Sequence, residues 1–173
     1  MTSRRVLCVR REHEHIYDPF DVNSGDLTVW VDKKESETSP LFRQVIPYCI
    51  VTSNGMIMRY HRQGSEQRLR GMLSIGVGGH VEEGETFLDC MRREIQEELS
   101  IHPDEYTYSP TGKHLIISTS PVSHAHLGVV VMIDVDLDYK LKVTDEIGDA
   151  QFWRIGELML PKNYLEAEDW SKI

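Results

Sequence analysis

Three glutamates in one short segment, Glu94, Glu97 and Glu98, are the residues best placed to do chemistry in this sequence. Apolar residues recur around them at helical spacing, which predicts a helix over residues 86–99. At about 100° per residue, Glu98 falls among the apolar positions of that helix, Glu94 lies at their edge and Glu97 lies further round. A carboxylate that faces the core loses its hydration unless a cation or hydrogen-bond donors compensate. Because Mg²⁺ and Mn²⁺ prefer oxygen ligands, the three carboxylates predict a divalent-metal site.

A glycine-rich loop, residues 76–84, precedes this helix. Gly78 and Gly79 allow the backbone to approach a ligand closely. The start of the helix adds backbone N–H groups and the positive end of the helix dipole, which together favour a phosphate group. The loop and the glutamates therefore indicate a site for a substrate that carries phosphate.

The spacing of these residues resembles a known motif. Gly79, Glu85 and the run Arg93–Ile101 match the Nudix box, G-x5-E-x7-R-E-U-x-E-E-x-G-U, in which U is apolar. One fixed position departs from it, because Ser100 stands where the family has the glycine that eases the exit from the helix. Further segments resemble a Nudix subgroup described only as predicted phosphoesterases, at residues 44–48, 68–69, 74–80 and 126–128.

The resemblance implies an α/β fold, the Nudix α/β/α sandwich around a mixed β-sheet. It implies a pyrophosphohydrolase that cuts a phosphoanhydride bond in a nucleoside diphosphate linked to another group, with Mg²⁺ or Mn²⁺ as the cofactor. The metal ligands that it implies are Glu94, Glu97, Glu98 and the carbonyl of Gly79. Glu85 and Arg93 would form a structural ion pair that ties the loop to the helix.

The general base and the substrate contacts are less closely defined. In the family the base lies either on the box helix or in a late acidic loop, which leaves as candidates Glu98, Glu97, Glu146 and Asp145. Residues that could hold the phosphates or the base of a nucleotide are Arg59, Arg68, Gly78 and His80. His124 and His126 share a face of an extended segment, but we expect a structural role for them because no third metal ligand is evident.

Two regions are expected along the chain. Residues 1–43 form an N-terminal extension with short strands near 4–9 and 27–31 and a charged connector over 33–40, and we assign it no chemistry. Residues 44–173 form the Nudix-like domain. Its strongest local signal is a hairpin whose turn, Asn54-Gly55, supplies two positive φ angles.

Composition limits the partners. The chain has 173 residues and a formal net charge of -9, which argues against nucleic acid as a partner but allows a polyphosphate bound through metal ions. No segment approaches the roughly 20 apolar residues of a membrane span, and the apolar run after the first arginines is too short for a secretion signal. We therefore expect a cytoplasmic protein with a small-molecule substrate and no membrane partner. Three cysteines without a C-x-x-C pair indicate no disulfide framework, and a homodimer through residues 1–43 is left open.

Two other functions share features with this sequence. Isopentenyl-diphosphate isomerase resembles this family in fold and uses a metal, but its reaction calls for a cysteine where residues 73–76 read Leu-Ser-Ile-Gly. A non-catalytic nucleotide-sensing module would be expected to have lost several carboxylates of the box, and this sequence keeps them all. Hydrolysis is therefore the prediction. The substrate itself is not named, because selectivity lies in loops outside the box.

Overall fold

Two compact units make up the computed structural model of this chain, and their segments alternate along the sequence. The first unit comprises Met1–Tyr48, Gly78–Met91 and Pro110–Val130, and the second comprises Cys49–Val77, Arg92–Ser109 and Val131–Ile173. The structure describes residues 4–63, 69–116, 124–136, 139–141, 145 and 147–171. No helix within those ranges combines the length and the apolar character that crossing a membrane requires.

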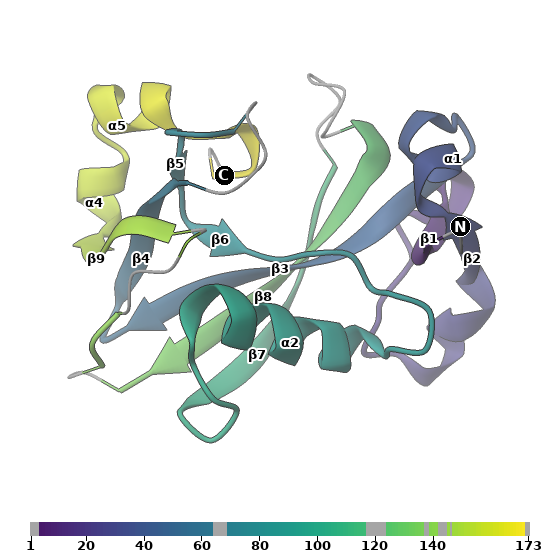
Figure 1. Cartoon of the computed structure of the whole chain (residues 1–173), viewed down its shortest axis with the longest axis horizontal. Helices are drawn as coiled ribbons and strands as arrows, with labels where there is room; N and C mark the ends of the chain where they lie inside the picture. Colours follow the sequence, from purple (N-terminus) through teal and green to yellow (C-terminus); the bar gives the residue numbers. More distant parts are fainter. Residues whose placement is uncertain are drawn as a thin grey trace. The chain divides into compact units, whose positions relative to one another are not determined.

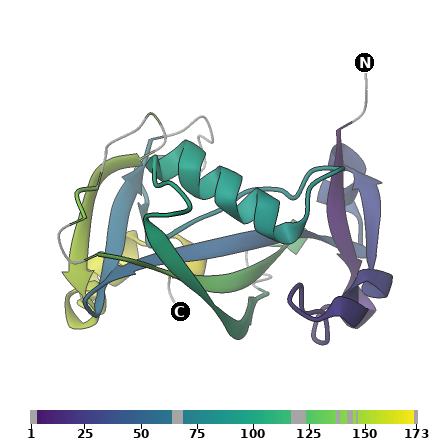
Figure 2. The same ribbon diagram turned by 90° about the horizontal axis from the view of Figure 1, so that it is seen from below.

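The first unit is built on three antiparallel strands that are neighbours in the sheet. Strand β1 (Arg5–Arg10) pairs with β2 (Thr28–Asp32) on one side and with β3 (Phe42–Ser53) on the other. Alternate residues of a strand share a face, so Val6 and Cys8 pack together and form a small core with other buried side chains. Figures 1 and 2 both show β1 and β2 side by side. The strands expected near 4–9 and 27–31 are thus confirmed.

Short helical segments connect these strands. Two 3-10 turns, η1 (Arg11–His13) and η2 (Val22–Leu27), lie between β1 and β2. Helix α1 (Lys33–Thr38) connects β2 to β3, so the connector expected over 33–40 is helical for most of its length, which was not predicted from the sequence. The Asp32 carboxylate accepts a hydrogen bond from the Glu35 N–H at 3.0 Å and caps the first turn. Helix α1 lies beside β1 and β2 (Figure 1), so a cap and packing stabilise a helix too short to show apolar periodicity.

The second unit begins with the predicted hairpin. The end of β3 pairs with β4 (Met56–Arg62) across a turn in which Asn54 and Gly55 have φ angles of 49° and 73°. Strand β4 also pairs antiparallel with β9 (Ile147–Arg154), and Figures 1 and 2 show these two strands side by side. The hairpin prediction is confirmed, because both turn residues have the positive φ angles that a tight turn needs.

Short elements complete the second unit. Strand β5 (Leu73–Ser74) pairs with β4, and β6 (Gly76–Val77) pairs with β3. The chain after β9 forms α4 (Ile155–Leu158), α5 (Pro161–Glu166) and the 3-10 turn η3 (Asp169–Ser171). A parallel bridge between Leu73 and Ala167 joins this last segment to β5.

Three further elements contain residues of both units: helix α2 (Phe87–Leu99), strand β7 (Tyr106–Leu115) and strand β8 (His126–Val135). Strand β8 pairs with β3 and β7. Helix α2 confirms the helix expected over 86–99, and its buried positions follow the helical period at Phe87, Cys90, Met91, Ile95 and Leu99. Thr86 and Asp89 cap its start by exchanging side-chain hydrogen bonds with each other's backbone N–H groups.

Candidate active site

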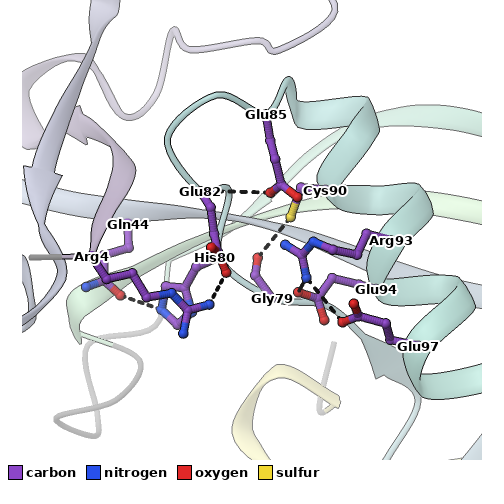
Figure 3. Close-up of polar contacts among 10 residues, drawn as sticks. All are labelled: Arg4, Gln44, Gly79, His80, Glu82, Glu85, Cys90, Arg93, Glu94 and Glu97. Carbon is purple, nitrogen blue, oxygen red and sulfur yellow. Dashed lines mark hydrogen bonds and ion pairs between the residues drawn. The ribbon is translucent and has the colours of Figure 1, made fainter. Parts of the chain in front are cut away.

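The glutamates of the box lie on one helix, and Arg93 links two of them. Its Nη1 donates to Glu94 at 2.5 Å and to Glu97 at 3.4 Å, as Figure 3 shows. The Glu94 side chain is only 12% exposed, whereas that of Glu97 is 62% exposed. A carboxylate as buried as Glu94 needs a compensating charge, and here the guanidinium supplies it.

Glu98 is half-buried, in keeping with its expected position among the apolar residues of the helix. Its charge acts on the fully buried hydroxyl of Tyr60 on β4. Burial is the main cause that raises the pKa of Tyr60, Arg62 lowers it, and the negative charges of Glu98 and Glu168 raise it further. Glu98 therefore lies within electrostatic range of a buried polar cluster of the second unit.

That cluster fixes the backbone ahead of the glycine loop. Tyr60 donates its hydroxyl hydrogen to the Gly76 carbonyl at 2.8 Å, and the Ser74 hydroxyl oxygen lies 3.0 Å from the same carbonyl oxygen. The Ser74 hydroxyl also contacts the carboxylate of Glu168, which is only 5% exposed and lies 3.5 Å from the Arg62 guanidinium. Sequence reasoning missed Glu168, because nothing in its local pattern distinguishes a buried glutamate near the C-terminus from a solvated one.

The glycine loop itself lies in the first unit and is held close to other backbone. A Cβ atom on Gly78 would lie 1.9 Å from the carbonyl oxygen of Pro47, so this position has room for glycine alone. The Gly79 carbonyl accepts a hydrogen bond from the Cys90 thiol at 3.6 Å (Figure 3). The role of Gly79 as a metal ligand and that of Gly78 as a substrate contact stay predictions.

Hydrogen bonds and ion pairs with the N-terminal segment anchor the later part of the glycine loop, residues 81–83. Leu7 donates its N–H to the Val81 carbonyl at 2.9 Å, and the side chains of Arg4 and Arg5 pair with Glu82 and Glu83 respectively. The N-terminal strands therefore hold the loop of the box, a contribution that the sequence did not suggest for residues 1–43.

Glu85 folds back on its own loop. Its carboxylate accepts a hydrogen bond from the Glu82 N–H at 3.0 Å, and the two residues also share a backbone hydrogen bond. The ion pair between Glu85 and Arg93 stays a prediction.

Arg59 is tied to neighbouring side chains of the second unit. Its guanidinium donates to Asp149 at 2.9 Å and to Gln151 at 3.1 Å, and it lies 4.3 Å from the ring centre of Trp153. The hydrogen bond from Arg59 is the main cause that lowers the pKa of Asp149. Arg59 is only 6% exposed, and a contact between it and substrate stays a prediction.

Two candidates lie outside the described residues, Arg68 as a substrate contact and Glu146 as the late general base. Asp145, the second late candidate, is exposed. In the first unit, His80 contacts His126 and Gln44, an arrangement that the sequence did not reveal because residues from separate elements form it.

The carboxylates of α2 fit a hard cation by their chemistry. Within the described ranges, no three His, Cys, Asp or Glu side chains are arranged so that they could hold a metal ion together. Glu94 and Glu97 both contact the single positive charge of Arg93, so these three side chains are already formally net negative, and the carboxylate of Glu98 adds a further negative charge to the same helix. Oxygen donors with excess negative charge are the ligand set that Mg²⁺ or Mn²⁺ prefers.

Comparison with known proteins places this arrangement in a family. The NUDIX domain model matches residues 43–172. Protein YmaB of Bacillus subtilis (strain 168) is 27% identical over 148 residues, covering 80% of this chain and 72% of that protein.

Solved structures show the same fold. Tm1382, named as a candidate Nudix hydrolase, has a TM-score of 0.73 at 23% identity and covers 97% of this chain and 94% of its own. DR0079 from Deinococcus radiodurans has a TM-score of 0.60 at 19% identity, with 95% of each chain covered. The chain therefore has the Nudix α/β/α sandwich with a mixed sheet.

Because the family model covers well over half of the sequence, the chain belongs to the Nudix family. It is a hydrolase that acts on the phosphoanhydride bond of a pyrophosphate group, the reaction class of that family.

Proposed function

We propose that this Nudix hydrolase depends on Mg²⁺ or Mn²⁺ and cuts the phosphoanhydride bond of a nucleoside diphosphate linked to another group. The observation that carries the proposal is the placement of Glu94 and Glu97 around one cationic group on α2, with half-buried Glu98 on the same helix. Such a set is stabilised by positive charge, and a divalent cation carries more of it than the single charge of Arg93 does.

The proposed metal ligands are Glu94, Glu97 and Glu98, with the Gly79 carbonyl as a further oxygen donor. A bound Mg²⁺ or Mn²⁺ would neutralise charge on the diphosphate and lower the pKa of the attacking water. Glu94 and Glu97 would exchange their contacts with Arg93 for the cation, which leaves the guanidinium to pair elsewhere, including with Glu85.

Proton transfer from the attacking water needs a carboxylate within hydrogen-bond reach of it. Glu98 is our first choice, because a half-buried carboxylate is less hydrated than the exposed Glu97. Glu97, Glu146 and Asp145 are the alternatives. Gly78 and His80 in the loop, together with Arg59 and Arg68, are the proposed contacts with the diphosphate and the nucleoside.

Variants of the box carboxylates test the proposal. The full-length chain would be incubated with Mg²⁺ and a panel of nucleoside-diphosphate derivatives, and the products identified by mass spectrometry. Glu97→Gln and Glu98→Gln should each lower the rate by about 10²- to 10⁴-fold, the usual contribution of a positioned acid or base. Gln96→Ala, at an exposed position of the same helix, is the matched control and should keep the parent rate.

Full activity in both glutamine variants would contradict the roles given to Glu97 and Glu98. Binding of a nucleotide by the parent protein without any product would favour a nucleotide-sensing module instead. A calorimetric titration with Mg²⁺ separates the two parts of the proposal, because it reports metal uptake whether or not the right substrate is in the panel.

A further inference from the structure

Two histidines from distant parts of the sequence meet in the first unit. Nε2 of His80, in the glycine loop, lies 3.3 Å from Nε2 of His126, the first residue of β8. The ring centres are 5.3 Å apart and the rings are inclined at 59°, so the rings do not stack face to face. The polar contact between the two imidazoles is thus made through their Nε2 atoms.

A third polar atom is held at that point by its own hydrogen bonds. The side-chain amide nitrogen of Gln44 donates to the Lys33 carbonyl at 3.0 Å and to the Ser36 hydroxyl at 2.7 Å. Both amide hydrogens are thus in use, so the amide oxygen must face His80, whose Nε2 lies 2.7 Å away (Figure 3). Because Gln44 is fully buried, this orientation is fixed by the surrounding first unit.

The separation of the two nitrogens is the one that a tetrahedral metal imposes. A zinc ion binds imidazole nitrogen at roughly 2.0–2.1 Å, and the tetrahedral angle then places two such nitrogens roughly 3.3–3.4 Å apart. The observed separation is 3.3 Å. In the metal-free state one ring hydrogen can bridge the atoms, and a metal ion would replace that hydrogen and use the lone pairs of both nitrogens.

We propose that His80 Nε2, His126 Nε2 and Gln44 Oε1 form a binding site for a divalent transition metal that favours imidazole, of which zinc is the representative. On binding, the single ring hydrogen of neutral His80 moves from Nε2 to Nδ1, so the Nε2 lone pair faces the metal and no net proton is released. The proposed site differs from the glutamates of α2 in the type of ligand it offers, because Mg²⁺ prefers oxygen ligands whereas zinc also binds nitrogen readily. It goes beyond the proposed function and does not depend on it.

Thiols do not compete for zinc in the native protein. Cys8, Cys49 and Cys90 are all buried. Burial raises the pKa of the Cys8 thiol to about 11, so it stays protonated at neutral pH and is a poor ligand. We therefore expect zinc binding by the folded chain to involve groups other than these thiols, and the histidine and glutamate variants identify them.

The test is calorimetric titration of the full-length chain with zinc chloride alone. The parent protein should bind one zinc ion, and His80→Gln and His126→Gln should each weaken that affinity by at least about tenfold, since each removes one of the two nitrogen ligands. His124→Gln is the matched control, because this exposed histidine lies two residues before His126. Zinc should also raise the Tm of the parent and of His124→Gln more than that of His126→Gln.

Equal affinity in the parent and in both His80→Gln and His126→Gln would overturn the site, as would the absence of zinc binding by the parent. Loss of the same affinity in Glu97→Gln would also overturn it, by moving the ion to the glutamates of α2. Circular dichroism shows whether each variant keeps its fold. Because no nucleotide is present, none of these results depends on whether the chain hydrolyses a diphosphate.

Discussion

The guanidinium of Arg43 donates to the carboxylate of Glu14 at 2.5 Å, and the two side chains are only 4% and 11% exposed. Arg43 also donates to the backbone carbonyls of His124 and His126, at 2.7 and 3.4 Å. This buried ion pair therefore joins the segment after η1 to β3 and to the start of β8, within the first unit.

Removing one partner of this pair should destabilise the protein strongly. Glu14→Ala leaves the Arg43 charge buried without its carboxylate, so we expect the free energy of unfolding to fall by about 3–5 kcal/mol. Glu12→Ala, at a side chain that is 70% exposed, should change it by about 0.5 kcal/mol or less. Urea unfolding of the three proteins measures both values, and equal stabilities for the two variants would refute the importance of the pair.

The contact between Arg59 and Asp149 predicts a dependence of stability on acid pH. Arg59 lowers the pKa of Asp149 below its ordinary value of 3.8, so the carboxylate contributes stability above that pH. The contribution is lost as the pH falls through the folded pKa. Asp149→Asn removes the titrating group and tolerates the positive φ of 52° at this position, so the fall in stability below about pH 4 should become shallower.

Stability near neutral pH should drop on the same substitution, because a neutral amide binds Arg59 less strongly than a carboxylate does. Asp26→Asn, at an exposed position of the first unit, is the control and should leave the acid slope unchanged. The direct measurement is an NMR titration of the carboxyl groups. A pKa for Asp149 at or above 3.8 in the folded protein would show that Arg59 does not hold it.

Ser100 follows helix α2 with a φ of 55°, a left-handed conformation that glycine, the residue at the matching position of the box, can adopt without steric cost. A residue with a Cβ pays roughly 1–2 kcal/mol for this conformation, and the greater freedom of glycine in the unfolded chain offsets part of the relief. Ser100→Gly should therefore stabilise the protein by about 0.5–1 kcal/mol.

Ser100→Ala serves as the control, because it removes the hydroxyl and keeps the strain, and it should not stabilise the protein. The free energies of unfolding of both variants, compared with that of the parent, test this prediction. A lower value for Ser100→Gly than for the parent would mean that interactions of the serine side chain outweigh the backbone strain.

Features that depend on residues close together in the sequence were predictable, whereas features that depend on tertiary contacts were not. Helix α2, the turn at Asn54-Gly55 and the half-buried position of Glu98 were predictable, because each depends on residues a few positions apart. Helix α1 was missed because a single capping residue and packing stabilise it. The contact of His80 with His126 depends on tertiary structure alone, so no local pattern could indicate it.

The approach of Gly78 to Pro47 leads to a last prediction, on the loop of the box. The added methyl of Gly78→Ala would lie 1.9 Å from the Pro47 carbonyl oxygen and 3.1 Å from its carbonyl carbon, so the clash is with backbone and not with the end of a flexible side chain. We expect a loss of about 3 kcal/mol or more in the free energy of unfolding, at the upper end of what overpacking costs. Gly25→Ala adds the same methyl where nothing lies within 4 Å, so it should be close to neutral. If the loop shifts and the fold is not destabilised, Gly78→Ala should keep its Tm and lose hydrolysis. If Gly78→Ala keeps both its Tm and its activity, the close approach of Gly78 to Pro47 has no importance in solution.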